Sequence, residues 1–260
     1  MVTQMAHTLV TMPFSHFCEK ARWSLEAARV PFREEGHCPL LHRVAVRRVG
    51  GRSSVPVLAV DGGPVLDDSP LIVQYADAHA PADRKLWPAS GAARDEGFAL
   101  ERELDVEFAP HVRRFVYFHV LPRRDQALQL FRVETPAREH ALARAVFPLI
   151  RAVMKRFMRI DESGMRRSQT AMRRVFDRIG DRLRDGRPYL LGDRFSAADI
   201  AFAAFASPMV LPPEHPKVQV DLGSLPGPLA DEVRTSRQHP AGLFALRLYR
   251  ERRGEAARHG

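Results

Sequence analysis

The chain has 260 residues, a formal net charge of +9 and 45% hydrophobic residues, enough to form one large domain or two smaller ones. No apolar run approaches the ~20 residues that cross a bilayer, and the first residues lack a signal-peptide pattern. Two cysteines, Cys18 and Cys38, are too few for a disulfide framework or a structural zinc site. We therefore expect a cytoplasmic protein with free thiols and no membrane partner.

The positive charge is carried mainly by arginines in the second half of the chain, most densely in residues 165–187. These arginines alternate with apolar residues, which is typical of a solvated helix face. An acidic ligand or surface is the alternative explanation. No zinc-finger, RNP-type or basic-zipper pattern accompanies the charge, so we do not expect a nucleic-acid partner.

The first eighty residues alternate between strand and helix patterns. "DGG" at 61–63 predicts a hairpin turn, and Ser69 followed by Pro70 predicts an N-cap and the first helical position. Together these patterns predict a four-stranded mixed sheet with helices on both of its faces. We expect strands at 7–11, 30–37, 55–60 and 64–68, and helices at 15–29, 40–49 and 69–80.

Strand patterns fade after a proline-rich linker, and helical patterns dominate the rest of the chain. The sequence thus predicts a small α/β domain (1–81), a linker (82–92) and an all-helical domain (93–260). The proline-rich stretch within 207–228 is expected to be a loop, which either covers a cleft or crosses the surface. We expect helices at 93–121, 137–159 and 163–185, a fourth that begins at 196, and two shorter ones at 228–236 and 240–253.

Four stretches, in this order and spacing, carry a resemblance to a known family. They are "MPFSHFCEKARW" (12–23), "SSVPVL" (53–58), "LDDSPLIVQYAD" (66–77) and "YLLGDRFSAADIAFA" (189–203). Together they resemble the soluble glutathione S-transferase superfamily, whose members join a thioredoxin-like domain to a helical-bundle domain. The last stretch contains a capping box, Ser196 to Asp199, which supports the fold and has no bearing on catalysis.

The resemblance implies a binding site for glutathione, a tripeptide with two carboxylates, an amine and a thiol. Val55 would pair its backbone with the cysteinyl part of glutathione, and a cis bond at Pro56 would turn that backbone towards the ligand. Ser69 would present the amide groups of a helix start to the γ-glutamyl carboxylate, with Asp68 near the amine. Arg52 is our candidate for the glycine carboxylate.

The resemblance also implies a catalytic residue directly before the Pro-Phe pair, but Met12 stands there and can neither donate a hydrogen bond nor act as a nucleophile. Three nearby residues are candidates. Ser15 lies at the expected helix start, where it either activates a thiol or only caps the helix. His16 either donates to a thiolate and titrates near neutral pH or is an exposed residue. Cys18 either forms a mixed disulfide in the first turn or is a small buried residue.

These assignments predict an enzyme that transfers glutathione to a small hydrophobic electrophile, with glutathione as co-substrate. The alternative is a catalytically silent protein of the same fold that binds a ligand or another protein. The resemblance further implies a homodimer. The electrophile would bind between the domains, against a wall whose candidate residues are Arg113, Tyr117, Phe118, His119, Met154 and Met158.

Overall fold

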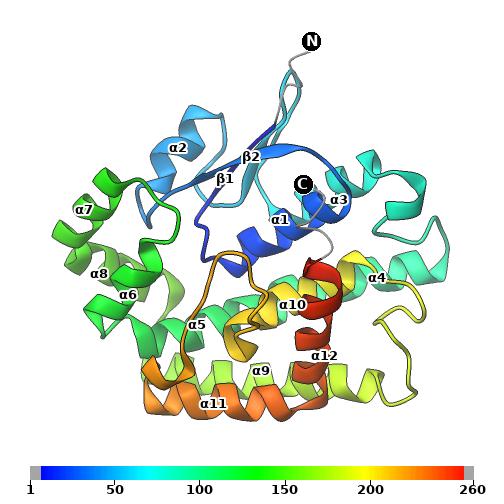
Figure 1. Cartoon of the computed structure of the whole chain (residues 1–260). Coiled ribbons are helices and arrows are strands. Elements are labelled where there is room, and N and C mark those ends of the chain that lie inside the picture. The colour runs from blue at the N-terminus through cyan, green and yellow to red at the C-terminus, as the bar shows by residue number, and fades with distance from the viewer. Residues whose placement is uncertain (1–6, 255–260) are drawn as a thin grey trace.

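The computed structural model describes residues 7–254, and residues 1–6 and 255–260, the ends of the two predicted domains, lie outside this range. A thioredoxin-like sheet domain sits above a larger helical domain (Figure 1). The predicted fold class is thus confirmed. In the described part of the chain, no helix is both long enough and apolar enough to cross a membrane.

The sheet contains four strands in the order β2-β1-β3-β4. β1 (His7–Thr11) pairs in parallel with β2 (Phe32–Gly36) and antiparallel with β3 (Val57–Ala59), which pairs antiparallel with β4 (Val65–Leu66). Gly62 adopts a φ of +65° in the turn between β3 and β4, a backbone conformation that favours glycine. The mixed sheet and the hairpin are therefore confirmed.

Three helices flank the sheet. α1 (His16–Ala27) and α3 (Ser69–His79) pack against each other on the face that meets the helical domain, and α2 (His42–Arg48) lies on the other side (Figure 1). The start of α3 differs from the expectation by one residue. Asp68 is the N-cap, because its carboxylate accepts the Ser69 N–H at 2.8 Å, so Ser69 is the first helical residue and Pro70 the second.

The helical domain begins with α4 (Ala92–Glu103), which continues through a π-helical segment (Leu104–Phe108) into α5 (Ala109–Val120). Pro110 has no N–H to donate to the preceding turn, which accounts for the irregular junction. Short 3₁₀ helices lie at Ala82–Arg84 and Leu222–Ser224, and a second π segment at Tyr249–Arg253. The remaining helices are α6 (Arg124–Phe131), α7 (Ala137–Ala145), α8 (Phe147–Met158), α9 (Glu162–Arg182), α10 (Ala197–Val210), α11 (Gly227–Gln238) and α12 (Pro240–Leu248).

Two expectations for this domain were wrong. The predicted helix at 137–159 is divided into α7 and α8, because the chain leaves helical geometry at Val146, two residues before Pro148. α6 was not predicted, since it is short and lies between Pro122 and Pro136.

α10 forms the centre of the helical domain. All of its residues except Pro208 are buried, which explains its alanine-rich sequence. The Ser196 N–H donates to the Asp199 carboxylate at 2.8 Å, and the reciprocal bond completes the predicted capping box. The other Asp199 carboxylate oxygen accepts the Leu190 N–H at 2.8 Å, which attaches the preceding loop to the helix.

A buried group of charged residues connects α1 to the sheet and to the C-terminal helices. We call it the Glu19 cluster. Arg22 donates to Glu19 and, at 2.8 and 2.5 Å, to both carboxylate oxygens of Glu34 on β2. Arg253 donates to Glu19 at 2.7 Å and also to Glu26. Burial opposes ionisation of Glu19, but the two guanidinium groups outweigh it and lower its pKa to about 2.

The cluster predicts a large effect of Glu19→Gln. Loss of this carboxylate leaves two buried guanidinium groups short of a counter-charge, which typically costs roughly 3–5 kcal/mol. The free energy of unfolding in urea measures the effect. Glu162→Gln removes an exposed helical partner of Arg166 and should change stability by less than about 1 kcal/mol. Equal effects of the two substitutions would contradict a stabilising role for the cluster.

Candidate functional site

The turn between β1 and α1 presents Ser15 at the start of a helix. The Ser15 N–H donates to the Met12 carbonyl at 2.8 Å, and its extended backbone (φ −78°, ψ 127°) places it at the N-cap position. Its side chain makes no capping hydrogen bond. The alternative that Ser15 serves only as a cap therefore loses support, and its hydroxyl lies near the positive end of the α1 dipole.

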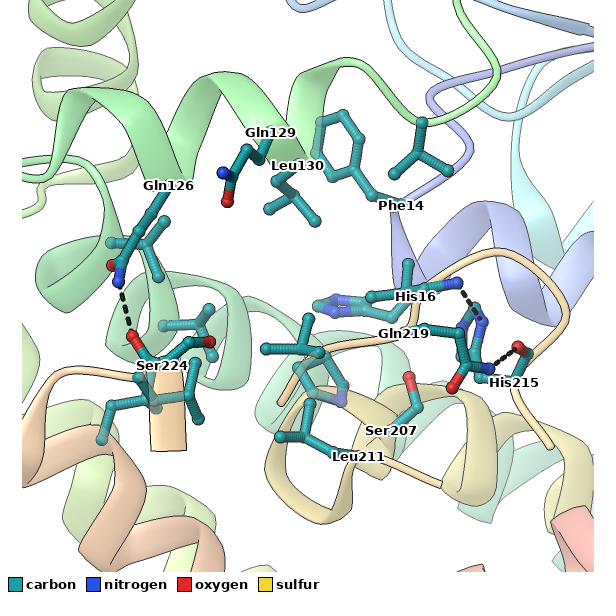
Figure 2. A pocket seen from close by; sticks show the side chains of 18 of the residues that line it. Phe14, His16, Gln126, Gln129, Leu130, Ser207, Leu211, His215, Gln219 and Ser224 are labelled. Atoms are coloured by element: carbon teal, nitrogen blue, oxygen red, sulfur yellow. Dashed lines mark hydrogen bonds between the residues drawn. The ribbon is translucent and has the colours of Figure 1, made fainter. Parts of the chain in front are cut away.

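Ser15 and His16 line a cavity of about 350 Å³ between the sheet domain and the helical domain (Figure 2). α5, α6 and the end of α10 supply about half of its remaining walls, and the segment 212–225 supplies most of the rest. The segment 212–225 closes one side, so the proline-rich loop covers the cavity rather than crossing the open surface. Of the residues expected in its wall, Arg113 and Tyr117 line the cavity, whereas Phe118, His119, Met154 and Met158 do not. The sequence did not single out the lining residues Gln126, Gln129, Ser207, His215 and Gln219.

His16 is buried rather than exposed, with 5% of its surface accessible. Burial, assisted by the positive charge of Arg113, lowers its pKa to about 3, so the imidazole is neutral at pH 7 and does not titrate near neutrality. Its Nε2 has no hydrogen-bond partner among the described residues. Neutral His16 thus brings no positive charge to the cavity.

The structure argues against Cys18 as a nucleophile. The residue lies in the first turn of α1, as expected, but its side chain is fully buried and is not part of the cavity lining. Burial raises the pKa of its thiol to about 12, which outweighs hydrogen bonding from the Met12 backbone and the Ser15 hydroxyl. The thiolate expected at this helix start is therefore scarce at neutral pH.

The predicted glutathione-binding residues lie on the sheet domain, outside the cavity lining. The peptide bond between Val55 and Pro56 is cis, as the resemblance implied. Within residues 7–254, the Val55 backbone N–H and C=O have no backbone partner. These two backbone groups, which precede β3, are therefore available to pair with an extended peptide.

Ser69 lies at the start of α3 with its side chain buried, and its hydroxyl finds no hydrogen-bond partner in the described chain. A buried hydroxyl without a partner is costly and suggests a polar ligand. The exposed Asp68 carboxylate lies next to it. These groups fit the α-carboxylate and amine of a γ-glutamyl group.

Arg52 is exposed and donates to both carboxylate oxygens of Asp67, at 2.5 and 3.1 Å. This ion pair connects the loop before Val55 to the residue before Asp68. It places Arg52 beside the predicted site but gives its guanidinium group a protein partner. The glycine carboxylate would have to share Arg52 with Asp67.

A second buried charge group, which the sequence did not reveal, joins the domains near these residues. Lys20 on α1 lies 2.7 Å from a Glu101 carboxylate oxygen and 2.6 Å from one of Asp105. Burial, despite the nearby ammonium, raises the pKa of both carboxyl groups, and Asp68 adds a smaller contribution in the same direction. The start of α3 is therefore electrostatically coupled to α4 and the π segment.

His215 organises the segment that closes the cavity. Its Nδ1 accepts the backbone N–H groups of Lys217 and Val218 at 3.2 and 3.1 Å, and its ring stacks on Tyr249 with centroids 5.7 Å apart. Burial lowers the pKa of His215 to about 4, and the nearby Glu19 carboxylate opposes this only in part. The neutral form is therefore the one that holds the segment in place.

Models of the two glutathione S-transferase domains match the sequence. The N-terminal domain model matches residues 9–84 and the C-terminal domain model residues 162–222, together just over half of the chain. The first match runs from within β1 to beyond the end of α3 and includes the other three strands, α1 and α2, and the second covers α9 and α10. The chain belongs to the glutathione S-transferase superfamily.

Solved structures share this fold at low sequence identity. A glutathione S-transferase from Xanthobacter autotrophicus Py2 is 17% identical, with a TM-score of 0.60 over 93% of this chain and 91% of that one. The beta-etherase LigF from Sphingobium sp. strain SYK-6 is 18% identical, with a TM-score of 0.61 over 94% and 99%. FzlA from C. crescentus is 19% identical, with a TM-score of 0.57 over 92% and 90%. No curated protein matches the sequence significantly.

The low pKa of His215 predicts acid sensitivity. Unfolded histidine titrates near ~6.5, so the unfolded state binds more protons between pH 6.5 and about 4 and stability falls as the pH decreases through this window. His215→Asn keeps an acceptor for the two N–H groups but does not titrate. It should flatten the plot of unfolding free energy against pH by up to ~1.4 kcal/mol per pH unit. An unchanged slope would contradict the assignment.

Proposed function

We propose that this protein is a glutathione transferase that joins the sulfur of glutathione to an electrophilic carbon of a second, largely apolar substrate. In this proposal the tripeptide lies along the sheet domain, with Val55 and the start of α3 as its main contacts. The cavity beside Ser15 receives the second substrate.

The chemistry requires a thiolate. The glutathione thiol gives its proton to water, the sulfur electron pair forms a bond with the electrophilic carbon, and the leaving group departs with the electrons of its former bond. A free thiol has a pKa near ~8.5. Each ~1.4 kcal/mol of preferential stabilisation of the thiolate lowers this pKa by one unit.

Ser15 is the observation on which the proposal rests. It combines a hydroxyl that is not used for capping, a position at the positive end of α1, and access to the cavity. Both the hydrogen bond and the helix dipole favour a negative sulfur. His16 adds a neutral ring to the lining of the same cavity, whereas the Cys18 side chain is buried and does not line it.

Ser15→Ala should lower the rate of conjugation of glutathione to a generic aryl halide by roughly tenfold or more, since the thiolate loses one hydrogen-bond donor. Cys18→Ala is the matched variant, and it should retain the wild-type rate if the reaction is conjugation. A rate that falls with Cys18→Ala and not with Ser15→Ala would instead favour thiol transfer through the cysteine.

Ser69→Ala should weaken glutathione binding by at least about tenfold, because a hydrogen bond to a charged group contributes ~1.5–3 kcal/mol. Calorimetric titration with glutathione measures the change. Ser24→Ala is the control, since the buried Ser24 hydroxyl donates to the Lys20 carbonyl within α1. Equal affinities of the Ser69 and Ser24 variants would contradict the proposed position of the γ-glutamyl carboxylate.

One feature favours a second candidate function, a silent ligand-binding protein of the same fold. Met12 occupies the position before the Pro-Phe pair and packs against the hydrophobic core, where it offers no hydrogen bond to sulfur. Such a protein would bind glutathione, and would be stabilised by it against thermal unfolding, without turnover. The rate of the wild-type enzyme in the conjugation assay distinguishes the two functions.

A further inference from the structure

Arg113 differs from the other arginines in the protein interior. Arg22 and Arg253 are almost fully buried, and each pairs with two carboxylates of the Glu19 cluster. Arg113 on α5 is mostly buried, but within the described chain it makes no ion pair and its Nε has no hydrogen-bond partner. An uncompensated guanidinium group in such a place is costly unless an anion joins it.

Arg113 is part of the cavity lining and lies against aromatic groups rather than acids. Its guanidinium carbon is 5.6 Å from the centre of the Phe17 ring, and its charge acts on both His16 and Tyr117. Burial lowers the pKa of Arg113, as expected for a cation without a counter-charge. Its neighbour Arg114 adds positive charge and donates to Ser168 and to the Met158 carbonyl.

The other lining residues leave Arg113 as the main source of charge in the cavity. His16 and His215 are neutral at pH 7, with pKa values of about 3 and 4. The carboxylate of Asp221 also belongs to the lining, but Asp221 is exposed and accepts the Gly223 N–H at 3.2 Å. The cavity lining thus contains one mostly buried cation, Arg113, and one solvent-exposed carboxylate, Asp221.

The remaining walls favour a ligand with an apolar body. Phe14 and Leu130 lie on one side of the cavity and Leu211 on the other, with Gln126 and Gln129 along α6 (Figure 2). A volume of about 350 Å³ lies at the small end of the range for ligand pockets, ~300–1,000 Å³. The space suits one small amphipathic molecule.

We propose that the ligand of this cavity is an amphipathic organic acid whose carboxylate pairs with Arg113 while its apolar part contacts Phe14, Leu130 and Leu211. The identification of this ligand as the second substrate rests on the proposed transferase function. The preference for an acid is independent of that function, because it depends only on the unpaired guanidinium group of Arg113. Arginine offers a carboxylate two parallel hydrogen bonds, which gives the preference its geometry.

Calorimetric titration of the purified protein with octanoate and with octanol, in the absence of glutathione, tests the proposal. The two probes share an apolar chain and differ in charge. We expect the wild-type protein to bind octanoate at least about tenfold more tightly than octanol, and Arg113→Gln to lose this preference while its affinity for octanol stays unchanged. Arg113→Lys, a second variant that keeps the charge, should retain part of the preference.

Arg102→Gln is the charge-matched control, because Arg102 is exposed on α4 and is not part of the cavity lining. It should behave as the wild type. The proposal would be overturned if the wild-type protein bound the two probes equally or did not bind octanoate. It would also be overturned if the preference for octanoate survived Arg113→Gln. Failure of the transferase function would appear separately, as absence of glutathione binding or turnover with the octanoate preference intact.

Discussion

The buried pairing of Arg22 with Glu19 and Glu34 is the constraint on which the site depends. Arg22 holds α1 against β2, and one of its nitrogens lies 3.4 Å from the Pro13 carbonyl, inside the turn that presents Ser15. Glu19 extends the pairing to Arg253 near the C-terminus. Because charges taken out of water are stable only with good partners, the turn, the helix and the C-terminal segment hold one another in place.

The same charges position the wall of the cavity. Lys217, next to the turn that His215 organises, lies 3.6 Å from a Glu34 carboxylate oxygen and 2.5 Å from one of Glu134. The segment 212–225 is thereby attached to the sheet domain as well as to the helical domain. In the proposed function, the tripeptide would lie along Val55 and the start of α3, and its apolar partner would occupy the cavity that Ser15 lines.

The sequence predicted the parts of the fold that local patterns encode. Alternating strands, the turn at Gly62 and the box from Ser196 to Asp199 depend on neighbouring residues and were correctly predicted. The pairing of Arg22 with Glu34, the isolation of Arg113 and the burial of Cys18 arise from tertiary packing. No spacing in the sequence establishes them. The sequence left Cys18 as either a reactive thiol or a small buried residue, and the structure shows that it is buried.

The central claim is that Ser15 and the start of α1 stabilise the thiolate of bound glutathione. Titration of the ultraviolet absorbance of that thiolate against pH, with the protein in excess over glutathione, tests it most directly. The account predicts an apparent pKa clearly below the ~8.5 of a free thiol, and a return towards that value in a protein that lacks the Ser15 hydroxyl. A bound thiol that titrates as it does in water, with or without that hydroxyl, would contradict the account.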